Sequence, residues 1–175
     1  MLNALHEAEQ RLPTLLRDGD AWQSVFVDYH PPFVERLWRQ WGRYRIYLHH
    51  IHPCGENEAL FHPHPWPSAM RVLGGTYEMV LGFGAGEAPP PRFVRLVLGP
   101  GSEYEMIDPD GWHFVRPLAG PTMSLMVAGK PWDRPSPKSD KLLDPLRPDA
   151  KAAILAFFRE HYPQPEGGRH HVVKG

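Results

Sequence analysis

The sequence predicts a mainly β protein, a barrel or sandwich of short strands with helical segments before and after it. Segments rich in branched and aromatic residues follow one another from residue 43 to residue 129, among them RYRIYLHHI, TYEMVLGF and WHFVRPL, and Gly, Pro or Asp separates them. Many short strands at regular spacing are typical of a sandwich or barrel. The 21 prolines and 16 glycines agree with this prediction, because both residue types favour turns over long helices.

Length, charge and cysteine content narrow the class of protein. At 175 residues we expect a single domain over residues 1–175 that is large enough to bury a core. The net charge of −1 creates no field that would attract nucleic acid or an anionic membrane. The single cysteine excludes an internal disulfide. Charged residues interrupt the N-terminal apolar positions, so we expect neither a signal peptide nor a membrane span, and a cytoplasmic location.

Residues 1–42 are predicted to form an N-terminal helical segment. In residues 3–17, apolar side chains recur near the helical period of 3.6 residues. Residues 24–30, SVFVDYH, are predicted to form a short strand. After two prolines, residues 33–41, FVERLWRQW, are predicted to form a second helix, because their apolar side chains would gather on one side of it.

The barrel itself is placed at residues 43–129, and residues 130–175 follow it as an irregular segment, a helix and a tail. The segment before residue 149 is rich in Pro and Asp, which favours an irregular crossing. Residues 149–162 show the clearest apolar stripe of a helix, and Asp149 is predicted to cap it.

The histidines are crowded into one part of the chain. His49, His50, His52, His62 and His64 all lie within a short stretch. Histidine is the commonest metal ligand among the side chains. The crowding therefore indicates a metal site.

His62 and His64 have the spacing that two ligands of one metal need. In an extended chain residues i and i+2 point to the same face, so these side chains project together. The prolines around them stiffen the backbone and leave one edge of the stretch without amide donors. His113 begins a later strand, directly after the turn-forming sequence PDG. A turn there can bring the chain back beside His62, and three neutral imidazoles leave open positions on a six-coordinate ion.

These segments resemble the two motifs of the cupin family. HPHPWPSAMRVLGGTYE is similar to the first motif, two histidines one residue apart followed by a strand that ends in glycine. DPDGWHFVRPL resembles the second motif, and PTMSLMVAG resembles the closing strand of small bacterial cupins that are similar to cysteine dioxygenases. The resemblance implies a double-stranded β-helix, the jelly-roll barrel of cupins, with N-terminal helices and a C-terminal helix.

The resemblance also implies the metal ligands. The usual first motif supplies a glutamate four or five residues after the second histidine, where this chain has Ser68 and Ala69. A site of three histidines is therefore implied, as in thiol dioxygenases and diketone-cleaving dioxygenases. Glu78 could be a fourth ligand. One divalent ion is expected, Fe(II) first, with Ni, Cu, Mn and Zn as alternatives that affinity alone does not exclude.

Substrate-binding residues are predicted on the strand before the first motif. Arg45, Tyr47 and His49 share one face of it, while His50 and His52 share the other, and the sequence leaves open which set faces the cavity. In thiol dioxygenases an arginine on an early strand pairs with the substrate carboxylate, and a guanidinium matches a carboxylate in two-pronged fashion. Arg45, Tyr47 and His49 are accordingly the expected substrate-binding residues, with Tyr47 also a candidate catalytic residue.

The leading hypothesis is a non-haem Fe(II) dioxygenase that uses O2 to oxidise a small polar substrate such as a thiol, a diketone or an acid. Three alternatives stay open: a non-oxidative isomerase or lyase that uses the metal as a Lewis acid, a ligand-binding or sensory cupin without turnover, and a metal-free structural barrel. Neither nucleic acid nor a membrane is an expected partner. A homodimer formed through the barrel edges is favoured over a monomer.

Overall fold

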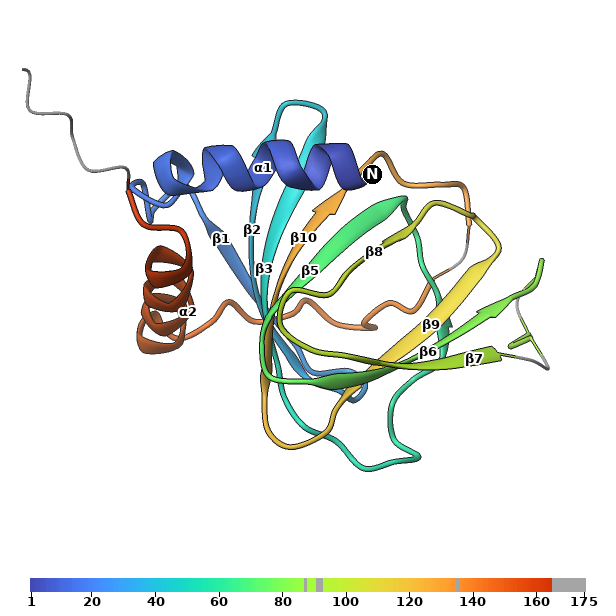
Figure 1. The fold of residues 1–175 in the computed structure, drawn as a ribbon. Coiled ribbons are helices and arrows are strands. Elements are labelled where there is room, and N and C mark those ends of the chain that lie inside the picture. The colour runs from blue at the N-terminus through green and yellow to red at the C-terminus, as the bar shows by residue number, and fades with distance from the viewer. Residues whose placement is uncertain (87, 91–92, 135, 165–175) are drawn as a thin grey trace, which may run out of the picture.

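The structure is a computed structural model that describes residues 1–86, 88–90, 93–134 and 136–164. Within these residues the chain forms two antiparallel sheets, with a helix near each end (Figure 1). The six-stranded sheet has the order β1 (Gln23–Val27), β2 (Val34–Trp41), β3 (Tyr44–Ile51), β10 (Thr122–Ala128), β5 (Ser68–Gly74) and β8 (Glu103–Met106). The four-stranded sheet has the order β4 (His62–Pro63), β9 (Gly111–Pro117), β6 (Tyr77–Phe83) and β7 (Phe93–Leu98).

The strands from β3 through β10 pair in a nested order. β3 pairs with β10, β4 with β9, β5 with β8, and β6 with β7, as if one long hairpin had been folded over into two sheets. This pattern is the double-sheet jelly roll, so the predicted fold class is confirmed by the strand order itself. The nesting matters for the site, because it pairs the short strand β4 with the distant strand β9.

Residues 34–41 form strand β2, so the prediction of a helix over residues 33–41 is wrong. β2 pairs with β1 on one side and with β3 on the other, and a two-residue turn with Gly42 at φ 54° joins β2 to β3. The apolar positions of FVERLWRQW fit both periods, and its Val and Trp residues are enriched in strands. Pairing with β1 and β3 on its two sides makes this segment a strand. Leu37 is fully buried on the outer face of the sheet.

The two helices cover the outer face of the six-stranded sheet, as Figure 1 shows for α1 (Leu2–Leu15). Buried residues of α1 such as Leu5 and Leu12 join Leu37 of β2 and Phe158 of α2 (Pro148–His161) in the main hydrophobic core. Asp149 lies in the first turn of α2 and does not cap it, because Pro148 starts the helix and Arg147 is the N-cap. Within the described residues, no helix is long and apolar enough to cross a membrane.

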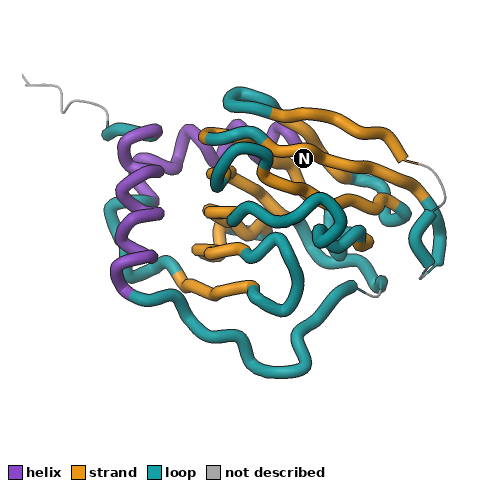
Figure 2. The backbone as a smooth tube through the Cα atoms, turned by 90° about the horizontal axis from the view of Figure 1, so that it is seen from below, coloured by secondary structure: helices purple, strands orange, loops and turns teal. Residues whose placement is uncertain are grey.

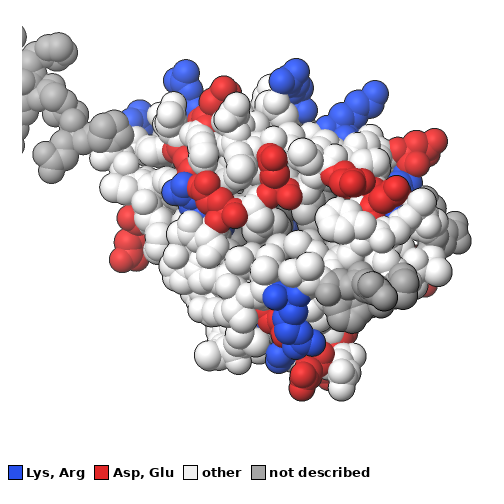
Figure 3. Space-filling model, turned by 45° about the vertical axis from the view of Figure 1, so that its right-hand side comes forward, with Lys and Arg blue, Asp and Glu red and all other residues white. Residues whose placement is uncertain are grey.

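The space between the two sheets is filled at one end only. There, the buried side chains of Tyr47, Met70 and Met126 form one cluster, and Val72, Tyr77 and Met79 form another. The irregular segment before α2 runs across the lower side of the molecule in Figure 2. On the surface shown in Figure 3, acidic and basic side chains are interspersed.

Candidate metal and substrate site

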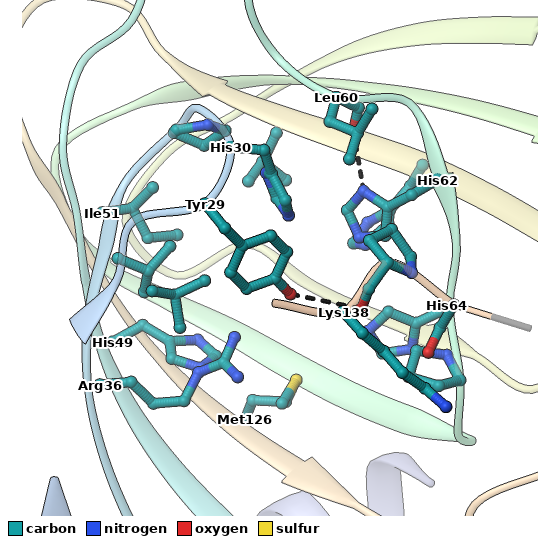
Figure 4. A pocket seen from close by; sticks show the side chains of 18 of the residues that line it. Tyr29, His30, Arg36, His49, Ile51, Leu60, His62, His64, Met126 and Lys138 are labelled. Atoms are coloured by element: carbon teal, nitrogen blue, oxygen red, sulfur yellow. Dashed lines mark hydrogen bonds between the residues drawn. The ribbon is translucent and has the colours of Figure 1, made fainter. Parts of the chain in front are cut away.

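A cavity of about 440 Å³ lies between the sheets at the unfilled end of the barrel. Figure 4 shows Arg36 and His49 on one wall and His62 and His64 on the opposite wall. The segment before α2 adds Lys138 to the lining, and the Tyr29 hydroxyl donates a hydrogen bond to the Pro137 carbonyl at 3.3 Å. No carboxylate is among the described residues that line this cavity.

The three histidines singled out in the sequence are brought together at this cavity. His62 of β4 and His113 of β9 are directly opposite in the strand register, and their ring centroids are 5.0 Å apart. The ring of His64 lies 4.9 Å from that of His113. All three side chains line the cavity, and His64 and His113 are each only 6% exposed. The nested pairing of β4 with β9 is what makes side chains about fifty residues apart adjacent.

Backbone carbonyls fix the orientation of two of these rings. The Nδ1–H of His62 donates to the Leu60 carbonyl at 2.8 Å, and the Nδ1–H of His64 donates to the Trp66 carbonyl at 2.9 Å. Because Nδ1 carries the proton, the neutral ring keeps its lone pair on Nε2, which has no hydrogen-bond partner among the described residues. A hydrogen bond from the second ring nitrogen is the usual support of a metal-binding histidine.

Burial keeps the three imidazoles neutral. The pKa of His62 and of His64 is lowered to about 4, mainly by desolvation; the hydrogen bonds to backbone carbonyls oppose this shift, and a neighbouring histidine and Arg36 add to it. Desolvation likewise holds the pKa of His113 well below its usual value, and its buried Nδ1 has no hydrogen-bond partner among the described residues. Neutral imidazole is the form that binds a metal, so the protonation state suits coordination near neutral pH.

Three neutral imidazoles are suitable ligands for a divalent cation, but here their nitrogen atoms lie farther apart than in a metal complex. The ligand atoms of the three histidines do not all lie within 4.8 Å of one another, a spacing that two other groups of described residues meet. Nitrogen atoms bound to one ion would be about 3.3 Å apart. Coordination therefore requires the rings to draw closer than they stand in the structure.

Arg36 is one of several cavity residues that the sequence analysis did not single out; Tyr29, His30 and Lys138 are others. Arg36 lies on β2 directly opposite His49 of β3, and its buried Nε has no hydrogen-bond partner among the described residues. Its guanidinium carbon lies 5.3 Å from the centroid of the Tyr47 ring, and burial lowers the pKa of Arg36. The guanidinium of an arginine without an opposing carboxylate is chemically suited to bind an anion. Had residues 34–41 been taken as a strand, alternation would have placed Arg36 beside His49.

His49 faces the cavity. The sequence had left open whether His49 or the pair His50 and His52 would do so. His49 is 3% exposed, and its buried Nε2 has no hydrogen-bond partner in the described part of the chain. Desolvation holds its pKa well below the usual value, and the charge of Arg36 lowers it further. His50 and His52 lie on the opposite face of the sheet.

Arg45 and Tyr47 share a face with His49 but do not line the cavity. The Arg45 guanidinium donates to the Tyr47 hydroxyl at 3.2 Å and lies 4.5 Å from the ring centroid of Trp38. Tyr47 is 4% exposed and stacks on Trp66 with centroids 6.0 Å apart. Both residues belong to the packed end of the barrel, so the substrate-binding role predicted for them does not fit their positions.

Glu78 points away from the cavity. Alternation along β6 directs Tyr77 and Met79 into the barrel and Glu78 to the outside, where it pairs with Arg95 and Arg116. It is 4% exposed, since these partners cover it. These contacts give no support to the suggestion that Glu78 is a fourth ligand. The tail expected after the C-terminal helix, from residue 165 on, lies outside the described residues.

Comparisons with known proteins add little to this geometry. No family model and no curated protein matches the sequence. Among solved structures, the chain is similar to hydroxypropylphosphonic acid epoxidase from S. wedmorenis, with 16% identity and a TM-score of 0.48 over 63% of this chain and 56% of that one. It is also similar to Fe(II)-HppE with (S)-1-HPP, with 13% identity and a TM-score of 0.49 over 63% of this chain and 57% of that one. The chain thus spans little more than half the length of these proteins. Similarity at this level carries no argument about fold or function, and the fold class rests on the strand order.

Proposed function

We propose that this protein is a metal-dependent cupin enzyme, a non-haem Fe(II) dioxygenase that oxidises a small organic acid. The observation that carries the proposal is the meeting, in one cavity, of three neutral imidazoles with a partly buried arginine that no described carboxylate neutralises. Open coordination positions and a charge-complementary substrate pocket are the two requirements of such chemistry.

His62, His64 and His113 would hold the metal through their Nε2 atoms. A bound Fe(II) would supply the activation of O2 that organic side chains cannot provide. Leu60 and Trp66 hold two of the rings in orientation through their carbonyl oxygens, and burial keeps these two ligands neutral. Ni, Cu, Mn and Zn suit the same imidazoles, and metal identity is therefore a matter for measurement.

Arg36 would bind the acid group of the substrate. Its planar guanidinium can make two parallel hydrogen bonds to a carboxylate or to a related oxyanion. His49, directly opposite on β3, has a buried Nε2 without a described partner and would hydrogen-bond to the same group or to a neighbouring polar atom. Lys138 at the rim would add positive charge. The cavity volume of about 440 Å³ suits a small molecule.

The decisive experiment combines elemental analysis with O2 uptake. Protein purified without chelators should contain one iron or another divalent metal in the cavity. Iron-loaded protein should consume O2 only with the right substrate, tested over a panel of small thiols, diketones and acids. The His113→Ala variant should lose the cavity metal and the activity, whereas His161→Ala, a control on the exposed end of α2, should keep both.

Each alternative has its own result in this experiment. Turnover that persists without O2 and with Zn(II) would establish a non-oxidative isomerase or lyase. Tight binding of an acid with no product by mass spectrometry would establish a ligand-binding cupin. A cavity that takes up no metal would refute the proposal.

A further inference from the structure

A second group of metal-binding side chains lies on the opposite face of the same sheet. Glu35 of β2 pairs directly with His50 of β3 in the strand register. His52 follows β3 in extended conformation, because its backbone amide donates to the Phe33 carbonyl at 2.9 Å. Since His50 and His52 are two residues apart in an extended chain, both project to the face that carries Glu35.

The three side chains already converge on one another. The His50 Nδ1–H donates to Glu35 Oε2 at 2.6 Å, and His52 Nε2 lies 3.5 Å from the same oxygen. The two imidazole centroids are 4.7 Å apart. In a tetrahedral site with metal–ligand bonds near 2.0 Å, neighbouring ligand atoms are about 3.3 Å apart. The two measured separations bracket that value, so small side-chain rotations would complete the coordination.

We propose that Glu35, His50 and His52 form a second divalent-metal site, distinct from the cavity and selective for Zn²⁺-like ions. Two imidazoles and one carboxylate are an established zinc donor set. The ion would replace the proton that the His50 ring now shares with Glu35. The side chains of Glu35, His50 and His52 are 21%, 25% and 37% exposed, so an ion can reach them from solvent without unfolding of the sheet.

The site would stabilise the part of the sheet that carries the cavity residues. Across the two strands Glu35 pairs with His50, and at the next register position Arg36 pairs with His49. An ion bound to Glu35 and His50 would therefore link β2 to β3 at the position where Arg36 faces His49. This role is structural, because the outer ion would lie on the other side of the sheet from the cavity.

The other group with suitable spacing, His6, Glu9 and Glu103, is less suited to a cation. Arg71 lies 3.1 Å from Glu9 and also pairs with Glu103, so both carboxylates already have a positive partner. No arginine or lysine pairs with Glu35 among the described residues.

The test is a count of bound Zn²⁺ by equilibrium dialysis and mass spectrometry. The variant His62→Ala/His64→Ala/His113→Ala removes the cavity ligands and should still bind one Zn²⁺. Adding His50→Ala and His52→Ala should abolish that ion, whereas adding His161→Ala, an exposed histidine outside both groups, should leave it in place. Zinc should raise the melting temperature of the first variant and not that of the second.

The outcomes separate this site from the cavity. If wild-type protein binds one Zn²⁺ that survives the cavity substitutions and is lost with His50→Ala/His52→Ala, the proposed function fails and the outer site stands. If the cavity variant binds no Zn²⁺, the outer site is refuted. Should the combined variant not fold, Glu35→Gln in the cavity variant preserves the side-chain shape and should weaken Zn²⁺ binding at least tenfold; unchanged affinity would equally refute the outer site.

Discussion

Replacing Arg36 with methionine should make the protein more stable and less able to bind its ligand. Arg36 holds its charge in the cavity with a buried Nε that lacks a partner among the described residues, and burial already lowers its pKa. Replacing a fully buried charged group with an apolar residue of similar volume stabilises by about 1–4 kcal/mol, and this range is an upper bound for Arg36 because the residue is only partly buried.

The net gain is smaller because Arg36 has one favourable contact. Its guanidinium lies 5.3 Å from the Tyr47 ring centroid, a cation–π contact worth about 1 kcal/mol. Arg36→Met should therefore raise the free energy of unfolding by up to about 3 kcal/mol. For a chain of this size, that gain corresponds to a rise in melting temperature of up to about 12 °C. An anionic ligand identified by screening should bind about 30- to 3,000-fold more weakly, because its charge would lose its buried partner.

Arg39→Met provides the matched control on the same strand. Arg39 points to the other face, and its buried Nε also lacks a partner among the described residues. Unlike Arg36, it has a hydrogen bond from Nη1 to the Leu15 carbonyl at 2.9 Å, and its guanidinium lies 5.5 Å from the Trp22 ring. Its replacement should lower stability and leave ligand affinity unchanged. Calorimetric melting and isothermal titration of both variants make the comparison. A loss of stability in Arg36→Met as large as in Arg39→Met would refute the assignment of Arg36 as an uncompensated binding group.

Three further predictions concern the cavity histidines and the sheet. In chelator-treated protein, His62 and His64 take up protons near the ordinary pKa of 6.5 in the unfolded state but only near 4 in the folded state. The free energy of unfolding should therefore fall as the pH drops from about 6.5 to about 4, by up to about 1.4 kcal/mol per pH unit for each histidine. Constant stability in urea titrations across that window would contradict the burial of neutral rings. Leu37→Ala should cost about 2–5 kcal/mol in urea unfolding, since Leu37 is fully buried; a cost below 1 kcal/mol would be inconsistent with β2 as a core strand. Gly75→Ala should cost about 1–3 kcal/mol, because Gly75 has φ +73° and an added Cβ would lie 2.5 Å from the Pro121 carbonyl oxygen; a neutral effect in thermal melting would show that this turn relaxes.

The grouping of His62, His64 and His113 was partly predictable because some of their placement depends on short-range rules. The i, i+2 spacing puts His62 and His64 on one face whatever the fold, and the turn before His113 limits where the next strand begins. The sheet pairing of β4 with β9 is long-range; the turn before His113 made it possible, and the resemblance to known motifs made it an expectation.

The residues expected to bind substrate were harder to predict. The two-residue alternation along a strand gives the face to which a side chain points, but not its position along the barrel axis. Arg45, Tyr47 and His49 do share a face, as alternation requires, but only His49 reaches the open end where the cavity lies. Arg36 was missed for another reason. Its segment fits helical and extended periods equally well, and the choice between them is made by hydrogen bonds to β1 and β3.

The most direct test of the account is an anomalous-scattering crystal structure of iron-loaded protein, recorded on both sides of the iron absorption edge. The account predicts an iron peak in the cavity within coordination distance of the Nε2 atoms of His62, His64 and His113, with the three rings closer together than they stand here. An iron peak elsewhere, with the three imidazoles still apart and hydrogen-bonded only to protein or water, would contradict it.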